Sequence, residues 1–114
     1  MNKTELNKQE LITKLSTLPD EIYLAESAIF EAQDGVMKAK DILSTKEADL
    51  YSEGKIDGKN SEIRTAQLRQ LTTPERNEIA KAENALSMAR ISFNQLQNTF
   101  VAYRAIAYML KAGE

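Results

Sequence analysis

The sequence contains two ladders of apolar residues that repeat every seven positions, one on each side of a glycine-containing loop. The first ladder consists of Ile22, Ile29, Val36, Leu43 and Leu50, with Ala25, Ala32 and Ala39 between them. The second consists of Ile79, Leu86, Phe93, Phe100 and Ala107, with Ala82, Ala89, Leu96, Tyr103 and Leu110 between them. Apolar residues at alternating spacings of three and four form a continuous seam along a helix. Because the small residues of one ladder can face the aromatic residues of the other, the two are predicted to pair as one long, antiparallel, coiled-coil-like helical hairpin.

Composition restricts the chemistry of this chain of 114 residues, a length typical of one domain. The absence of cysteine excludes disulfides, thiolate metal sites and a cysteine nucleophile, and the absence of histidine removes the commonest general base and metal ligand. No stretch approaches the roughly 18 apolar residues of a membrane span, and residues 1–10 lack the apolar core of a signal peptide. We therefore expect a single helical domain over residues 1–114, in the cytoplasm, without a cofactor, a metal ion or a membrane contact.

Capping residues and a proline predict two helices in the first half. Asn2 and Glu5 form a capping-box pattern for a helix over about residues 3–17. Pro19 is expected to end that helix, because proline disfavours the helical conformation of the residue before it. A second helix should then run over about residues 19–53.

Turn chemistry and a second proline predict two further helices. A cluster of glycine, aspartate and asparagine predicts a loop at residues 54–60, followed by a short helix at 61–71. Thr73 is a suitable N-cap and Pro74 a suitable first-turn residue for a helix over residues 74–111.

Apolar surface beside the predicted seam needs cover. Tyr23, Phe30 and Met37 fall seven apart on a flank of the second helix, and residues 101–110 are apolar nearly all round their helix. The first helix is expected to fold back at Pro19 over this surface, while the short third helix covers the other end. The predicted fold class is all-α: a long antiparallel helical hairpin with two short covering helices, together a helical bundle.

Apolar side chains left uncovered would favour association with another chain. Complete burial of one large apolar side chain contributes about 1.5–3 kcal/mol, and exposed apolar patches often mark interfaces. The candidate association residues are Tyr23, Phe30, Met37, Tyr108 and Met109. The alternative is that four of these side chains are core beneath the first helix: Tyr23, Phe30, Met37 and Tyr108. A mass in solution above that of the 12.8 kDa monomer would favour association.

The residue patterns do not predict an enzyme. Without histidine or cysteine, catalysis would need carboxylate pairs, lysine, tyrosine or serine, and the acidic pairs lie where solvated helix faces are expected. The loop at 54–60 lacks the Gly-Lys-Ser/Thr ending of a phosphate-binding loop and the ligand series of a calcium-binding loop. We predict no catalytic, cofactor-binding or metal-binding residue.

The charges are divided unequally between the two halves. Residues 1–54 carry six lysines and eleven acidic residues, whereas residues 55–114 carry nine cationic and six acidic residues. Within the second half, Lys55, Lys59, Arg64 and Arg69 lie at or near the loop and are candidates for binding a partner or a phosphate. The alternative is a solvated, salt-bridged loop, because the local cationic excess is small and no aromatic residue is interleaved to stack on bases.

Residues 50–68, with the sequence Leu-Tyr-Ser-Glu-Gly-Lys-Ile-Asp-Gly-Lys-Asn-Ser-Glu-Ile-Arg-Thr-Ala-Gln-Leu, resemble a segment of small uncharacterised helical proteins of phages and prophages of Gram-positive bacteria. The resemblance implies a phage setting and the cytoplasm of the host, and it brings no established activity. Small acidic helical proteins in that setting often bind host or replication proteins. The helical-hairpin substrates of type VII secretion share the length, but their Trp-x-Gly turn is absent because the chain has no tryptophan.

Two functions remain after these exclusions. The first is a non-enzymatic interaction or regulatory protein, oligomeric, that binds a protein partner such as a host or replication protein. The second is an accessory nucleic-acid-binding protein of phage replication or recombination. Salt-dependent retention on DNA distinguishes the two.

Overall fold

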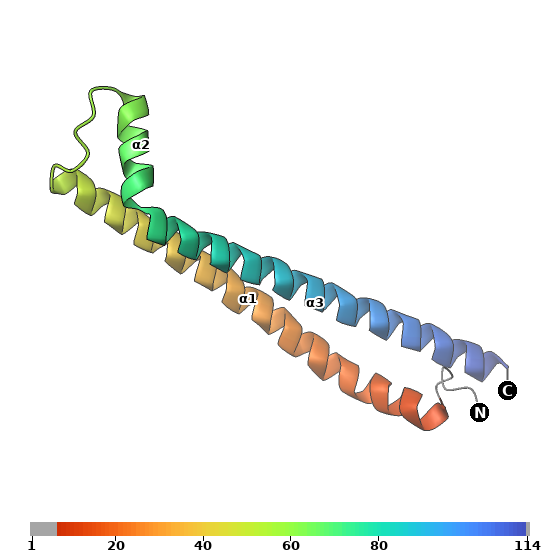
Figure 1. Ribbon diagram of the computed structural model, residues 1–114. Helices are drawn as coiled ribbons and strands as arrows, with labels where there is room; N and C mark the ends of the chain where they lie inside the picture. Colours follow the sequence, from red (N-terminus) through yellow and green to blue (C-terminus); the bar gives the residue numbers. More distant parts are fainter. Residues whose placement is uncertain (1–6, 114) are drawn as a thin grey trace. The chain divides into compact units, whose positions relative to one another are not determined.

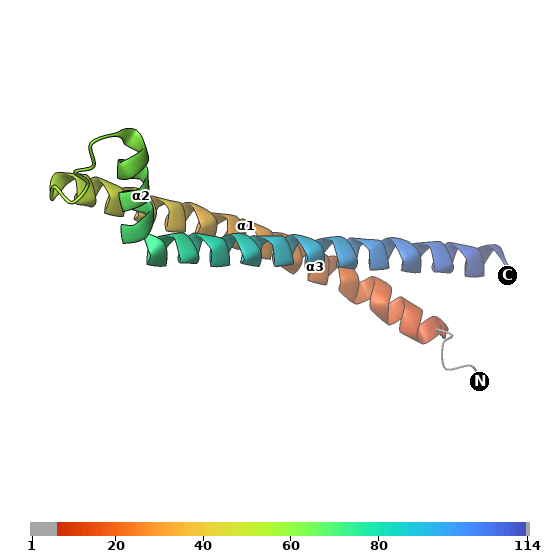
Figure 2. The same ribbon diagram turned by 45° about the horizontal axis from the view of Figure 1, so that its top comes forward.

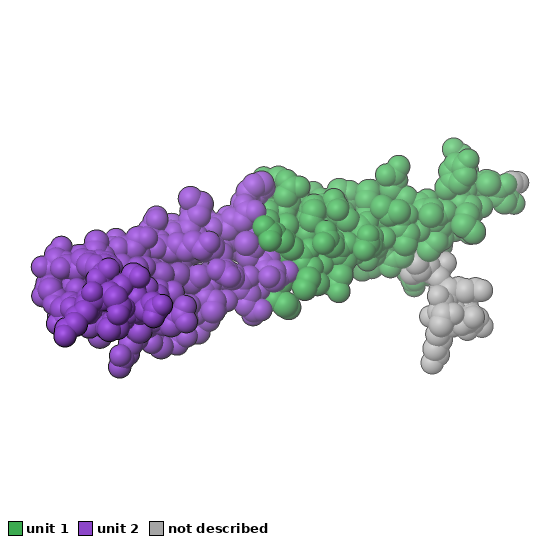
Figure 3. All heavy atoms as spheres, turned by 90° about the horizontal axis from the view of Figure 1, so that it is seen from above, with its two compact units in different colours: residues 1–29, 88–114 green, residues 30–87 purple. Residues whose placement is uncertain are grey.

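The computed structural model describes residues 7–113, which form three α-helices and no strand. The helices are α1 (Lys8–Ser52), α2 (Ser61–Leu71) and α3 (Thr73–Ala112) (Figure 1). This arrangement confirms an all-α helical hairpin. The chain divides into two compact units: unit 1 contains residues 1–29 and 88–114, and unit 2 contains residues 30–87 (Figure 3). Each unit therefore contains one part of α1 and one part of α3.

The predicted seam is present in both units. All the ladder residues are buried or half-buried except Leu110, which is exposed at the end of α3. Val36 and Leu50 have the lowest exposure among the predicted ladder residues of unit 2, at 8% and 3%. The alternating spacing of three and four residues therefore identified the face of each helix that packs against the other.

Pro19 does not end a helix, and the prediction of a break there is wrong. Helix α1 continues through Pro19, which lies inside it and is exposed. The reason is packing: Leu11, Leu15 and Leu18 continue the ladder toward the N-terminus, and Leu11 and Leu18 are only 4% and 2% exposed. A proline in a helix interior costs about 3 kcal/mol, whereas burying each leucine contributes about 1.5–3 kcal/mol. The buried leucines therefore outweigh the proline.

The start of α1 differs from the predicted start. The predicted cap at Asn2 and the first residues of the helix over 3–17 lie outside the described residues. In the structure, Asn7 caps the helix: its Oδ1 accepts a hydrogen bond of 2.7 Å from the backbone N–H of Glu10. The Glu10 side chain also accepts a hydrogen bond of 3.2 Å from Asn7 Nδ2.

The first covering helix is also absent as a separate element. Because α1 is continuous, no segment of residues 7–18 folds back over Tyr23, Phe30 or Tyr108. These three side chains are 69%, 63% and 76% exposed. The interpretation of this surface as core beneath a first helix is therefore wrong, and α2 is the one short helix of the described chain.

The loop of unit 2 begins with a glycine-capped helix end. Gly54 has a φ of +71°, a left-handed conformation that favours glycine. The Gly54 N–H donates to the Tyr51 carbonyl at 3.1 Å, and the Lys55 N–H donates to the Leu50 carbonyl at 3.0 Å. These two bonds form a Schellman motif, which satisfies carbonyls that the end of α1 would leave unpaired. Ile56 then turns inward and is 8% exposed, so it anchors the loop.

Side chains of α2 hold the rest of the loop. The Gln67 carbonyl oxygen accepts from the Gly58 N–H at 2.9 Å, and its amide nitrogen donates to Asp57 Oδ1 at 2.8 Å. Arg64 Nη1 donates to the Gly58 carbonyl at 3.1 Å. At the start of α2, Asn60 accepts a capping bond of 2.9 Å from the Ile63 N–H. In two views the loop lies beside α2 (Figures 1 and 2).

A single buried residue, Thr72, joins α2 to α3. Its Oγ1 donates to the Leu68 carbonyl and accepts a hydrogen bond of 3.0 Å from Arg76 Nε, and the residue is fully buried. The Thr72 carbonyl accepts the Arg76 N–H at 3.0 Å. Thr72 therefore precedes α3, and the prediction that Thr73 caps it is wrong by one residue, because Thr73 is the first residue of the helix.

Candidate interaction surfaces

The five residues predicted to mediate association are all strongly exposed. Tyr23, Tyr108 and Met109 lie in unit 1 and are 69%, 76% and 70% exposed. Phe30 and Met37 lie on the part of α1 that belongs to unit 2 and are 63% and 65% exposed. No element of their own unit covers these apolar side chains, so they are available to another molecule.

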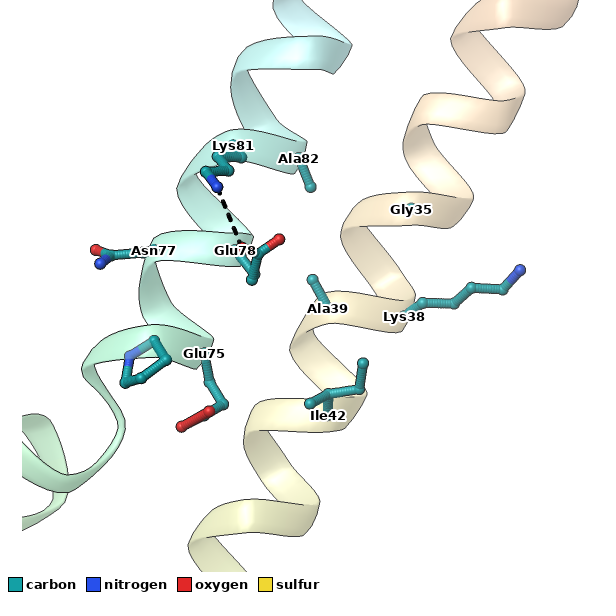
Figure 4. Close-up of a pocket in the computed structure, with 10 residues that line it drawn as sticks. Gly35, Lys38, Ala39, Ile42, Glu75, Asn77, Glu78, Lys81 and Ala82 are labelled. Carbon is teal, nitrogen blue, oxygen red and sulfur yellow. Dashed lines mark hydrogen bonds and ion pairs between the residues drawn. The ribbon is translucent and has the colours of Figure 1, made fainter.

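Unit 2 has a shallow groove between α1 and α3 (Figure 4). Its volume is about 970 Å³, and Gly35, Ala39 and Ile42 line its α1 side. Figure 4 shows Ala39 on the side of α1 that faces α3 and Ala82 on the side of α3 that faces α1, while Ile42 lines the groove from α1. Ile42 is 61% exposed, so the groove has an apolar wall that an incoming side chain could contact. Lys81 Nζ pairs with Glu78 on α3 at 3.3 Å.

One polar atom of this groove lacks a hydrogen-bond partner. Glu75, in the first turn of α3, lines the groove, and its Oε1 is buried without a hydrogen bond in the described chain. The positive end of the helix dipole favours a carboxylate at this position.

Unit 1 has two adjoining grooves on one of its sides. The first, about 530 Å³, is lined by Leu15, Val101 and Tyr108 with Arg104 at its edge. The second, about 280 Å³, is lined by Leu11, Ile12 and Leu110. Leu15, Ala107 and Lys111 line both, so the two grooves form one apolar surface edged by cationic side chains.

The four cationic residues predicted at the loop have different roles in the structure. Lys55 Nζ forms an ion pair of 3.0 Å with Glu53, and Arg64 donates to the Gly58 carbonyl. Arg64 therefore holds the loop, and substituting it would change the loop conformation. Lys59 and Arg69 are exposed. The structure does not gather the four side chains around one common site.

Two exposed ion pairs shift pKa values in unit 2. The Asp34 carboxylate, 2.8 Å from Lys38 Nζ, raises the pKa of Lys38 by hydrogen bonding and then by charge attraction. A hydrogen bond from Lys55, followed by its charge, lowers the pKa of the Glu53 carboxyl. Both pairs are solvent-exposed, so they are screened by salt and contribute little to stability.

Among residues 7–113, no group of three or more acidic side chains is arranged to hold a metal ion. In the same part of the chain, no helix combines the length and hydropathy needed to cross a membrane.

Several exposed apolar residues were not among the predicted association residues. In unit 1 these are Ile12, Leu24, Val101 and Ile106, and in unit 2 the clearest is Ile42. Their signal was in the sequence: Ile12 and Tyr23, and likewise Val101 and Tyr108, fit spacings of three and four beside the main ladders. The predicted helix break at Pro19 concealed this pattern, because a separate first helix would have covered these residues and made them part of the core.

In comparisons with known proteins, the chain matches no family model, no curated protein and no solved structure. The resemblance of residues 50–68 to phage proteins stays a prediction.

Proposed function

We propose that the chain is a non-enzymatic interaction protein that binds a protein partner through its uncovered apolar surface. As part of the same proposal, it acts in the cytoplasm, and in the host cytoplasm if a phage encodes it. The partner class is a host or replication protein.

The observation that carries this proposal is the exposure of the five apolar residues Tyr23, Phe30, Met37, Tyr108 and Met109, each between 63% and 76%. A single exposed apolar residue is ordinary, whereas several large ones that recur along one helix, as Tyr23, Phe30 and Met37 do every seven residues on α1, favour an interaction surface. Such a surface is typical of a chain that is completed by binding.

Nucleic-acid binding is less favoured than protein binding. Of the four cationic residues at the loop, Lys55 is paired with Glu53 and Arg64 holds the Gly58 carbonyl. Few phosphate contacts could then form, and affinity for nucleic acid depends on the number of phosphates neutralised.

The test is affinity capture from an extract of the cell that produces the chain, followed by purification of the captured protein and measurement of its Kd. The wild type is compared with the double variant Phe30→Ser and Met37→Ser, which removes two exposed side chains of unit 2. The matched control is Met88→Ser with Ile91→Ser, which removes two exposed apolar side chains of unit 1. We expect the Phe30 and Met37 variant to weaken binding at least tenfold and the control to retain it.

Two outcomes would contradict the proposal. One is equal binding by both double variants at wild-type affinity, which would mean that the apolar stripe of unit 2 is not used. The other is salt-dependent retention of the wild type on DNA that Lys59→Glu and Arg69→Glu abolish, since that result would assign the alternative function.

A further inference from the structure

One side of unit 1 carries two outward-facing ladders that the seam between α1 and α3 does not use. Their residues alternate at spacings of four and three, so each ladder occupies one side of its helix. They are Ile12, Ser16, Pro19, Tyr23 and Glu26 on α1, and Arg90, Asn94, Gln97, Val101, Arg104, Tyr108 and Lys111 on α3. Ile12 and Lys111 line the same groove, which places both ladders on the same side of the unit. We name this surface the Tyr23 face.

The Tyr23 face exposes four large apolar side chains among polar and charged ones. Ile12 and Tyr23 are 55% and 69% exposed, and Val101 and Tyr108 are 63% and 76% exposed. The groove beside Val101 and Tyr108 also reaches the half-buried Leu15 of the seam. An occupant of this face would therefore bury aromatic and aliphatic side chains together, the composition of an interface centre.

The size of the face matches what a dimer needs. The described part of α1 in unit 1 runs from Lys8 to Ile29, or about 33 Å at 1.5 Å per residue, and two helices side by side are about 20 Å wide. The projected area is thus roughly 660 Å², before side-chain relief is added. A stable interface buries about 800 Å² of accessible surface on each partner.

Charge selects the occupant and its orientation. On the Tyr23 face, α3 carries Arg90, Arg104 and Lys111, whereas the one charged residue of the α1 ladder is Glu26. If α3 lay against α3 of a second copy, cations would face cations. If α3 lies against α1 of a second copy, its cations face the α1 ladder, whose one charge is Glu26, and every helix has antiparallel neighbours. Four helices in this arrangement form an antiparallel bundle.

The same geometry places one unused ion pair between the copies. Glu26 and Arg90 are exposed on the Tyr23 face, and neither forms an ion pair within residues 7–113. Leu15 shares a groove with α3 residues between Val101 and Lys111, so eleven residues further along α1, Glu26 is level with residues between about 90 and 100, a range that begins at Arg90. A two-fold axis parallel to the helices keeps each residue at its own level, and it therefore brings Glu26 of one copy opposite Arg90 of the other.

We propose that two copies of this chain pair through the Tyr23 face of unit 1, with α3 of each against α1 of the other. The proposal rests on the proposed function in that both use exposed apolar surface. Its readout is the mass of the purified chain alone, whereas the proposed function is read from binding to another protein through unit 2. A wild-type monomer would therefore overturn self-association and leave the proposed function standing.

The first experiment is size-exclusion chromatography with light scattering over a range of protein concentrations. The wild type should have twice the mass of the 12.8 kDa chain. Tyr108→Glu and Tyr23→Glu should each halve that mass, because each places a carboxylate in the centre of the apolar face. The matched controls are the next residues along each helix, Met109→Glu and Leu24→Glu. They are similarly exposed but point about 100° away, onto the other side of the unit, and should keep the dimer mass.

The second experiment exchanges charges between copies and keeps the proposal testable if a tyrosine variant fails to fold. Glu26→Arg alone places the introduced arginine of each copy opposite Arg90 of the other copy. Arg90→Glu alone places the introduced glutamate opposite Glu26 of the other copy. Each variant should therefore form a weaker dimer, which dissociates into monomers at protein concentrations at which the wild-type dimer is still intact. A mixture of the two variants restores both ion pairs and should form a heterodimer with wild-type affinity, detected by native mass spectrometry.

Three results would overturn the proposal. These are a monomeric wild type at all concentrations, loss of the dimer in Met109→Glu or Leu24→Glu with retention in the tyrosine variants, and equal loss in both sets. Failure of the charge-exchanged mixture to pair would exclude the α1-against-α3 orientation, and with it the proposal.

Discussion

Replacing Gly58 with alanine tests the tightest contact of the loop in unit 2. A Cβ atom at this position would lie 2.5 Å from Ile63 Cγ2, 3.0 Å from the Arg64 backbone nitrogen and 3.0 Å from Gln67 Oε1. Atoms do not tolerate such distances, so the loop must move away from α2. Overpacking of this kind costs about 1–3 kcal/mol.

Movement of the loop also strains the two hydrogen bonds that hold Gly58, from its N–H to Gln67 and from Arg64 to its carbonyl. Each contributes about 0.5–1.5 kcal/mol. Alanine restricts the unfolded chain and returns about 0.4–1 kcal/mol. We therefore expect Gly58→Ala to lower the free energy of unfolding by about 2–3 kcal/mol, measured by urea denaturation followed by circular dichroism at one fixed protein concentration.

Two other glycines are matched controls for this substitution. Gly35 lies inside α1 with no atom within 4 Å of an added Cβ, so Gly35→Ala should raise the free energy of unfolding by about 0.5–1 kcal/mol. Gly54 also has open space but a φ of +71°, so Gly54→Ala should lower it by about 1 kcal/mol. If Gly58→Ala proved as stable as the wild type, or more stable than Gly54→Ala, the close approach of the loop to α2 would be refuted.

Single contacts lead to three further predictions. Pro19→Ala should raise the free energy of unfolding by about 1–3 kcal/mol, because Pro19 lies inside α1 and proline is about 3 kcal/mol less favourable than alanine there; an unchanged urea midpoint would argue against a continuous helix. Asn60→Ala removes the cap of α2 and should cost about 1 kcal/mol, whereas Asn60→Asp should cost much less; equal urea midpoints for the two variants would contradict this. Lys55→Gln should raise the pKa of the Glu53 carboxyl, because Lys55 lowers that pKa. The pKa can be measured by NMR titration of the Glu53 carboxyl carbon. A lowered pKa in the folded state stabilises the fold above the unfolded pKa, and that stabilisation is lost as pH falls through the folded pKa; a Glu53 titration that is the same in both proteins would exclude the pair.

The helical hairpin could be predicted because the apolar residues of its seam repeat at regular intervals along the sequence. Spacings of three and four residues at Val36 and Leu50, or at Phe93 and Phe100, depend on the helix alone and not on the rest of the fold. The loop was equally readable, since Gly54 and Asn60 act through local backbone geometry. Pro19 was misjudged because its local preference opposes packing between segments distant in the sequence. The ladder through Leu11, Leu15 and Leu18 crosses the proline in phase, and that continuity was the better guide.

The candidate surfaces were predictable in composition but not in arrangement. Tyr23 and Tyr108 stood out as apolar residues beside the seam, yet their exposure depended on whether a third segment covered them. The roles of Arg64 and Gln67 could not be predicted, because the hydrogen bonds that they make to the loop depend on its three-dimensional path. A count of cations near the loop cannot separate residues that hold the backbone from residues that face solvent.

The two units differ in how the chain builds them. Unit 2 is one uninterrupted stretch, residues 30–87, whereas unit 1 joins residues 1–29 to residues 88–114. Closing a longer loop costs more conformational entropy, and contacts between distant residues form more slowly. We therefore expect assembly to begin at the Schellman turn and the clamp by α2, with the two chain ends meeting last. During synthesis on the ribosome, the part of α1 that belongs to unit 1 must wait until residues 88 onward have emerged before its apolar side can pack against α3.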